Sequence, residues 1–233
     1  MALNFGSKQK TFQGERQLIA HTTPKSPITE QYRNIRTNIQ FAAVGEQFRT
    51  LMFTSANPSE GKTTTTANTA VVFAQQGQKV LLVDADLRKP ATHTILREKN
   101  VNGLTSVLAG QHPLEKCIRP TLVENLYFLS AGAIPPNPAE MLGSSRMKTL
   151  TQEMLEQFDL VIFDTPPVLA VTDAQVLANL CDGIVLVVRS GRTDKDAALK
   201  AKNLLQNATG KLLGAILNDK QQKENEHYYY YGN

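Results

Sequence analysis

The sequence predicts an α/β protein with a mostly parallel central sheet and helices on both faces. Six short apolar runs, rich in leucine or β-branched residues, are separated by segments long enough to form crossover helices. These runs are apolar along most of their length rather than at alternate positions, so both faces of the sheet are expected to be buried. A chain of 233 residues with 41% hydrophobic residues is long enough for one large domain with a substantial core.

The expected elements begin with an amphipathic helix and continue as alternating strands and helices. Thr29 could cap the first helix, in which Tyr32, Ile35 and Ile39 recur at helical spacing through residues 30–42. Strands are expected at 50–56, 79–86, 125–132, 160–167, 183–190 and 211–218. Helices are expected near 62–76, 144–157, 173–181 and 193–207. The turn-rich stretch 90–138 is expected to supply connections and small helices at the rim of the sheet.

Three parts of different composition divide the chain. Residues 1–27 are polar, contain two prolines and show no sustained periodicity, which indicates an N-terminal arm rather than core. Residues 28–219 carry the strand and helix pattern and are expected to form a single domain. Residues 220–233 are expected to be a flexible C-terminal tail, and they include four consecutive tyrosines.

Charge and cysteine content exclude several functional classes. The formal net charge is +4, but the basic residues are scattered and form no long run, so no nucleic-acid partner is expected. Cys117 and Cys181 lie far apart without a C-x-x-C pattern, which argues against a disulfide framework or a zinc site. The N-terminus lacks the apolar core of a signal peptide, and no stretch approaches a membrane span. The expected location is the cytoplasm, with any membrane association made through another chain.

The stretch SANPSEGKTT, residues 55–64, resembles the phosphate-binding pattern G-x-x-x-x-G-K-[ST], with Ala56 in place of the first glycine. In such a loop, backbone N–H groups and a helix N-terminus hold the phosphates. Lys62 would reach the β- and γ-phosphates, and the Thr63 hydroxyl would coordinate Mg²⁺. The alternative is a Gly-Lys-Thr helix start with no ligand. The expected nucleotide-binding residues are Pro58, Ser59, Glu60, Gly61, Lys62, Thr63 and Thr64.

Three aspartates follow expected strands. Asp84 and Asp86 end the second strand, and Asp164 ends the fourth in the manner of a Walker B aspartate that holds the metal's water shell. Ligands of open parallel sheets bind at the carboxyl ends of strands, so these carboxylates are expected beside the phosphate loop. The alternative for the first pair is a salt bridge with Arg88 or Lys89, or a helix cap.

The C-terminal cluster Tyr228, Tyr229, Tyr230 and Tyr231 admits two readings. No periodicity lets all four rings face one core, so a low-complexity exposed tail is one interpretation. The other is that the phenols accept phosphoryl groups from a nearby nucleotide.

Five motifs together resemble the bacterial tyrosine kinases, in the cytoplasmic form of Gram-positive capsule and exopolysaccharide systems. They are ANPSEGKT, LLVDADLR, VIFDTPP, the E-x-x-R-x-x-R helix EQYRNIR and the terminal YYYY, and they span nearly the whole chain. The resemblance implies a P-loop NTPase fold of the ParA/MinD-like group, with residues 28–219 as the kinase domain. It also implies ATP and Mg²⁺ as cofactors.

The same resemblance assigns roles to residues and suggests partners. Lys62, Thr63, Asp84, Asp86 and Asp164 would form the ATP and Mg²⁺ site. Glu30, Arg33 and Arg36 match the helix that joins neighbouring subunits of a homo-oligomeric ring, an octamer in this family. Further implied partners are a membrane adaptor of the polysaccharide co-polymerase type, which would recruit the chain to the inner face of the membrane, and a cognate tyrosine phosphatase.

For the reaction, the sequence supports autophosphorylation of the tail in trans. Lys62 and Mg²⁺ held by Thr63, Asp86 and Asp164 would neutralise charge on the transferred phosphoryl group. Asp84 is the expected proton acceptor, although exchanging the roles of Asp84 and Asp86 fits nearly as well.

Two rival interpretations have different consequences. One is a ParA- or MinD-like ATPase without kinase activity, because Asn218 resembles the adenine-contacting asparagine of that group. Asn57, however, stands where that class usually carries a second lysine. The other is a non-catalytic interaction module with an aromatic tail.

Overall fold

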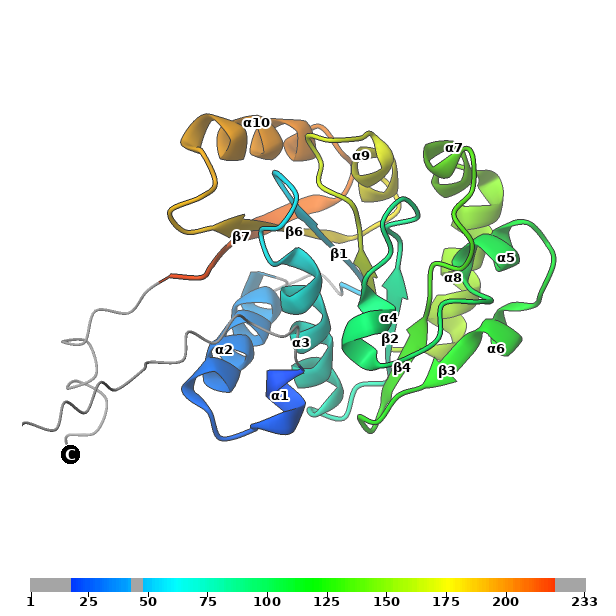
Figure 1. Ribbon diagram of the computed structural model, residues 1–233, viewed down its shortest axis with the longest axis horizontal. Helices are drawn as coiled ribbons and strands as arrows, with labels where there is room; N and C mark the ends of the chain where they lie inside the picture. Colours follow the sequence, from blue (N-terminus) through cyan, green and yellow to red (C-terminus); the bar gives the residue numbers. More distant parts are fainter. Residues whose placement is uncertain (1–17, 43–47, 221–233) are drawn as a thin grey trace, which may run out of the picture.

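A seven-stranded sheet forms the centre of the protein in the computed structural model, which describes residues 18–42 and 48–220 (Figure 1). The strand order is β3-β4-β2-β5-β1-β6-β7, and every pair is parallel except β3 with β4. The strands are β1 (Thr50–Ser55), β2 (Val80–Asp84), β3 (Ile118–Pro120), β4 (Leu126–Leu129), β5 (Leu160–Asp164), β6 (Gly183–Arg189) and β7 (Lys211–Asn218). The mostly parallel sheet and the six strands expected from the apolar runs are confirmed.

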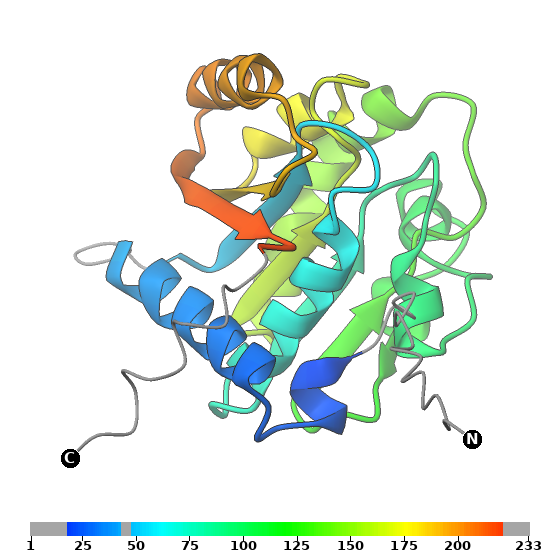
Figure 2. The same cartoon turned by 60° about the vertical axis from the view of Figure 1, so that its left-hand side comes forward.

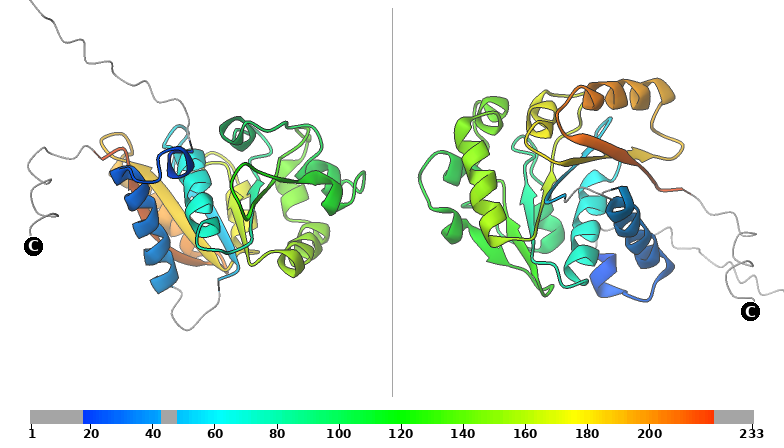
Figure 3. Two further views of the ribbon diagram at one scale, coloured as in Figure 1. Left: turned by 90° about the horizontal axis from the view of Figure 1, so that it is seen from below. Right: turned by 180° about the vertical axis from the view of Figure 1, so that it is seen from behind.

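Helices cover both faces of this sheet (Figures 1 and 3). One face packs against α1 (Ile19–Thr22), α2 (Pro27–Ala42), α3 (Lys62–Ala74) and α4 (Thr92–Leu96). The other packs against α5 (Leu104–Leu108), α6 (Leu114–Cys117), α7 (Pro138–Leu142), α8 (Ser145–Gln157), α9 (Asp173–Ala178) and α10 (Lys195–Gln206). Along β1, Leu51 and Phe53 enter the first core and Met52 enters the second. Side chains alternate along a strand, so burial on both faces explains the uninterrupted apolar runs.

The carboxyl ends of β2, β5 and β1 lie next to one another. Asp84 at the end of β2 is in register with Asp164 at the end of β5, and Phe53 of β1 is in register with Asp164 on its other side. At the opposite end of the sheet, Asp182 Oδ2 accepts hydrogen bonds from the Arg49 and Thr50 N–H groups, each at 2.9 Å. Asp84 and Asp164, which are expected to bind ligand, therefore lie together at the carboxyl edge of the sheet.

The start of the domain differs from the expected boundary. Part of the segment assigned to the polar arm belongs to the domain: α1 packs against α2 and α3, where Ala20 is fully buried and its N–H donates to Asn68 Oδ1 at 2.9 Å. The first long helix begins at Pro27, and Ser26 rather than Thr29 caps it, because Ser26 Oγ accepts from the Thr29 N–H at 3.1 Å. Thr29 is instead buried inside the first turn, where its hydroxyl donates to the Thr23 carbonyl.

The stretch 90–138 contains the expected small helices, α4, α5 and α6, together with a strand that the sequence did not indicate. Strand β3 has only three residues, ends in Pro120 and pairs antiparallel with β4 at the edge of the sheet. A proline is tolerated at such an edge because no neighbouring strand needs its missing N–H. Among the helices of the described ranges, none combines the length and the apolar character that a membrane crossing requires.

Candidate functional site

The phosphate loop connects β1 to α3 and turns sharply at Gly61. Gly61 has a φ of 85°, in the left-handed region, and a Cβ placed on it would lie 1.9 Å from Asn218 Nδ2. The Asn218 amide in turn donates to the Glu60 carbonyl at 2.9 Å. Backbone conformation and the close approach of Asn218 both require glycine here. Asn218 is thus located against the loop, as expected for a residue at the nucleotide site.

The start of α3 offers a set of free backbone donors. The first helical hydrogen bond is from the Thr65 N–H to the Gly61 carbonyl at 2.9 Å, and no side chain caps the helix. In the described part of the chain, the N–H groups of residues 61–64 have no acceptor. A helix N-terminus with unpaired donors favours an anion, so this loop fits a nucleotide phosphate.

A cavity of about 350 Å³ lies directly in front of the loop. Its lining combines the phosphate loop, the end of the β2 segment and the turn after β5. The lining residues are Ser55, Pro58, Ser59, Glu60, Gly61, Lys62, Thr63, Thr64, Asp86, Arg88, Lys89, Ala91, Pro166, Pro167, Ala170 and Val171. All the expected residues of the phosphate loop from Pro58 to Thr64 therefore face one cavity.

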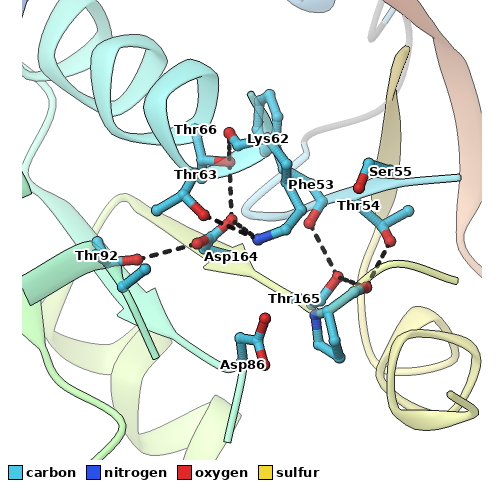
Figure 4. Close-up of polar contacts among 12 residues, drawn as sticks. Phe53, Thr54, Ser55, Lys62, Thr63, Thr66, Asp86, Thr92, Asp164 and Thr165 are labelled. Atoms are coloured by element: carbon cyan, nitrogen blue, oxygen red, sulfur yellow. Dashed lines mark hydrogen bonds and ion pairs between the residues drawn. The ribbon is translucent and has the colours of Figure 1, made fainter. Parts of the chain in front are cut away.

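Lys62 lies between two of the expected metal ligands (Figure 4). Its ammonium nitrogen is 2.5 Å from Asp164 Oδ1 and 3.2 Å from the Thr63 hydroxyl. Asp164 is buried and also accepts from the hydroxyls of Thr66 at 3.2 Å and Thr92 at 3.0 Å. A cation held by a carboxylate and a hydroxyl shows that the donor set suits positive charge, and these are the oxygen ligands that Mg²⁺ prefers.

The two aspartates of the second strand occupy different environments. Asp84 is fully buried, and its carboxylate accepts from the backbone N–H groups of Asp86, Ala91 and Thr92 at 3.1 to 3.3 Å. Burial, followed by repulsion from Asp164, raises the pKa of Asp84 to about 8. Asp86 lines the cavity, and its Oδ1 accepts from the N–H groups of Arg88 and Lys89. Of the pair, Asp86 is the one that lines the cavity.

Arg88, considered as a salt-bridge partner of Asp84 or Asp86, pairs with a different carboxylate. Arg88 binds Asp173 through two parallel contacts of 2.9 Å, from Nε to Oδ2 and from Nη2 to Oδ1. Asp173 is fully buried at the start of α9, and its role in this ion pair was not predictable from the sequence. Thr66 and Thr92, which both bind Asp164, were missed as well. An isolated threonine or a helix-start aspartate carries no distinctive sequence signal, because these residues are common at helix starts and turns.

The described residues contain no group of three or more histidine, cysteine, aspartate or glutamate side chains arranged to hold a metal ion by themselves. A magnesium ion at Thr63, Asp86 and Asp164 would therefore depend on nucleotide phosphates to complete its ligands, as is usual for this cation. The four tail tyrosines, Tyr228 to Tyr231, lie outside the described residues.

A larger cavity of about 820 Å³ separates α2 from the edge strand β7 and includes Asn218 at its border. Figure 2 shows α2 lying beside α3 and below β7. Tyr32 and Thr65 both line this cavity, and burial raises the Tyr32 pKa. This cavity is bounded mainly by apolar side chains, whereas the smaller cavity is lined by the phosphate loop and Asp86.

The three residues expected to join subunits do not share one environment. Glu30 and Arg33 form an ion pair with each other on the surface of α2. Arg36 is turned toward the domain, where its Nη1 donates to the Val72 carbonyl in the last turn of α3 at 2.8 Å. Glu30 and Arg33 are therefore available on the surface, whereas Arg36 is bonded within the chain.

Together the sheet order, the glycine turn and the strand-end carboxylates define a P-loop nucleotide-binding protein of the MinD type. Residues 49–207 match the AAA domain family. The structure of the septum site-determining protein MinD from Pyrococcus horikoshii, complexed with Mg-ADP, has a TM-score of 0.65 at 29% identity, over 76% of this chain and 72% of that chain. The predicted fold class is confirmed.

The closer relatives are tyrosine kinases. The chain is 55% identical over 218 residues to tyrosine-protein kinase YwqD of Bacillus subtilis. The aligned residues cover 94% of this chain and 92% of the relative. The crystal structure of the chimerical protein CapA2B2 has a TM-score of 0.85 at 42% identity, over 88% of this chain and 90% of that chain. The chain belongs to the bacterial tyrosine kinase family, as its motifs indicated.

Proposed function

We propose that this chain is an ATP-dependent protein-tyrosine kinase that phosphorylates its own C-terminal tyrosine cluster in trans and regulates capsular or exopolysaccharide synthesis. The observation that carries the proposal is the convergence of Lys62, Thr63 and Asp164 at one end of a cavity that Asp86 lines. The chain's 55% sequence identity to tyrosine-protein kinase YwqD, over 94% of its length, favours a kinase over an ATPase.

In this proposal, ATP occupies the cavity with its phosphates on the free N–H groups of residues 61–64. Thr63 and Asp164 would hold Mg²⁺ with Asp86 nearby, and the ion supplies neutralisation of charge on the transferred phosphoryl group. Lys62, which lines the cavity, would exchange its contact with Asp164 for the phosphates. Asn218, whose amide donates to the Glu60 carbonyl of the loop, would contact the adenine base.

The proton of the acceptor tyrosine has two candidate acceptors. A phenol has an ordinary pKa of about 10, so a carboxylate must take its proton during transfer. Geometry precedes pKa in this choice, and Asp86 faces the cavity while Asp84 is buried with three N–H donors on its carboxylate. We assign the proton to Asp86, where the sequence had favoured Asp84, and give Asp84 the task of holding the turn that carries Asp86.

Variants of these two residues test the assignment. Asp86→Asn should lower kcat by about 10² to 10⁴, the range for loss of a general base. Asp84→Asn keeps the side-chain shape and removes a buried acid, so it should retain more activity than Asp86→Asn. The reverse order of the two kcat values would return the proton to Asp84.

Incubation with Mg²⁺ and γ-labelled ATP tests the kinase proposal directly. Stable label on tyrosine is expected, and it should disappear when the chain is cut after residue 220. Release of free phosphate without labelled tyrosine would favour the rival MinD-like ATPase, and neither product would favour a binding module.

Transfer in trans has its own test. A Lys62→Met, Asp164→Asn chain that keeps its tail is mixed with an active chain that ends at residue 220. Label should appear on the inactive chain and increase with the concentration of the active one. Absence of label at every concentration, with both chains folded, would eliminate the trans route.

The proposed partners are a ring of identical chains, a membrane adaptor of the polysaccharide co-polymerase type and a cognate tyrosine phosphatase. The ring would be an octamer assembled through α2, where Glu30 and Arg33 are on the surface. The adaptor would bring the chain to the inner face of the cytoplasmic membrane; the likeness to the chimerical CapA2B2 supports a two-component arrangement. Each phosphotyrosine adds roughly two negative charges, and this charge should loosen the ring by repulsion. ATP treatment should therefore reduce the particle mass measured by light scattering.

A further inference from the structure

Glu60 is an unusual residue for a phosphate-binding loop because it places a carboxylate beside the expected phosphates. The Glu60 side chain is buried, and it forms no ion pair with a lysine or arginine among residues 18–42 and 48–220. Its two oxygens are instead occupied by neutral donors. Oε2 accepts from the Asn57 N–H at 3.1 Å, and Oε1 accepts from the Thr193 hydroxyl at 2.7 Å. The Asn57 side-chain amide adds a longer contact of 3.5 Å to Oε1. A buried carboxylate is tolerated only when its lone pairs are satisfied, so these bonds fix its position.

Thr193 belongs to the turn between β6 and α10, 133 residues away in sequence from Glu60. The same hydroxyl accepts from the Arg189 N–H at 2.7 Å, so the turn orients Thr193 before it meets the loop. Thr193 is absent from the lining of both cavities beside the loop. Within the described ranges, its hydrogen bond to the phosphate loop is the one to Glu60.

Arg189, the last residue of β6, holds the neighbouring position of the loop. Its Nη1 donates to the Ser59 carbonyl at 3.1 Å, and its Nε donates to Asp219 Oδ2 at 2.9 Å. Ser59 has a φ of 65°, a left-handed conformation that costs a non-glycine residue energy unless its surroundings maintain it. One guanidinium therefore links the strained residue of the loop to the end of β7.

We propose that Thr193 and Arg189 are positioning residues for the phosphate loop. Thr193 acts through the Glu60 carboxylate and Arg189 through the Ser59 carbonyl. Together they hold residues 59 and 60 so that the N–H groups of the next residues point into the 350 Å³ cavity. The inference rests on the proposed nucleotide site and adds to it two residues that do not touch the nucleotide.

Loss of the Thr193 hydroxyl should weaken nucleotide binding more than it slows the chemical step. Thr193→Val keeps the shape of the side chain but cannot donate to Glu60, whose charge is then left without one of its two partners. We expect the dissociation constant and the KM for ATP to rise about tenfold, as for loss of a hydrogen bond to a charged group. We expect kcat to change less than about twofold, because Asp86 lies on a different segment. Thr193→Ser should restore the wild-type constants.

The experiment measures binding of an ADP analogue by calorimetry, steady-state kinetics, and amide hydrogen exchange of residues 56–61 without nucleotide. Thr209→Val is the matched control, because Thr209 also bonds a side chain, Asn179, but lies in an exposed turn. Faster exchange in the loop of Thr193→Val, with Thr209→Val unchanged, is the expected result. Arg189→Met should show the same pattern as Thr193→Val.

Two failures are distinguishable. If the wild-type chain does not bind the ADP analogue, the proposed nucleotide site is wrong. If the wild-type chain binds and Thr193→Val has the same dissociation constant, KM and loop exchange, the site stands and the positioning role is refuted. An equal loss of kcat in Thr193→Val and Thr193→Ser would also overturn it, because the hydroxyl would then have no part in the effect.

Discussion

Replacing Lys62 by methionine, the usual way to inactivate a P-loop enzyme, should also destabilise this protein before any nucleotide is added. Lys62 and Asp164 form a buried ion pair at 2.5 Å, with side-chain exposures of 8% and 1%. Removal of the ammonium leaves a charged Asp164 inside the protein, next to the acid of Asp84. Breaking one side of a buried pair typically costs about 3 to 5 kcal/mol.

The structure places the expected cost at the lower end of that range. Asp164 keeps two donors, the hydroxyls of Thr66 and Thr92, after Lys62 is removed. We therefore expect a loss of about 3 kcal/mol in unfolding free energy. At about 2 to 4 °C per kcal/mol for a chain of this size, Tm should fall by about 6 to 12 °C. Adding Asp164→Asn removes the unpaired charge and should recover most of this loss.

The assay is thermal unfolding in EDTA without nucleotide for the wild type, Lys62→Met and the double variant. Lys202→Met serves as the control, since Lys202 is exposed on α10 and its loss should change stability by less than about 0.5 kcal/mol. A Lys62→Met protein whose Tm equals that of Lys202→Met would refute the reasoning. A double variant less stable than Lys62→Met would refute it as well, because the destabilisation would then not come from the stranded charge.

Three further outcomes follow from the site and its support. Burial raises the pKa of Asp84 to about 8, so between about pH 4 and pH 8 the folded state holds a proton that the unfolded chain has released. The free energy of unfolding should therefore fall as pH rises through this window. In urea unfolding, the Asp84→Asn variant should show a weaker dependence of this free energy on pH. Ser144→Ala removes the hydroxyl that accepts from the Met147 N–H at the start of α8 and should cost about 1 kcal/mol in thermal unfolding, whereas Ser144→Asp should not. Asn218→Asp cannot donate to the Glu60 carbonyl and should raise the KM for ATP about tenfold, with Asn218→Ala separating lost contact from added charge.

The sequence predicted the fold and the location of the site because those signals are local. Apolar runs such as Leu51 to Phe53 indicate strands covered on both faces, and Gly61 with Lys62 marks a turn that enters a helix. Strand-end aspartates meet because the carboxyl ends of parallel strands lie at one edge. The relative placement of Asp84 and Asp86 was not predictable, since the chain leaves regular strand geometry after Asp84 and no longer alternates.

Contacts between distant segments escaped prediction for a different reason. The bond from Thr193 to Glu60 spans 133 residues, and the Ala20 contact with Asn68 spans 48. Neither involves a residue type or spacing that stands out in its own segment. Residues 18–26 were read as an arm because they contain few apolar residues, yet the side chain of Ala20 needs little space to be buried against α3. Strand β3 was missed because three residues ending in proline carry no strand pattern.

Helix α2 packs against α3, the helix that follows the phosphate loop. Arg36 of α2 donates to the Val72 carbonyl in the last turn of α3, and Tyr32 of α2 and Thr65 near the start of α3 line one cavity. A neighbouring chain that displaced α2 would therefore shift α3 and the N–H groups that face ATP. Thermodynamic linkage makes such an effect reciprocal: whatever factor assembly applies to ATP affinity, ATP applies to assembly. Nucleotide concentration would then set the number of chains per particle even before the first tyrosine is modified.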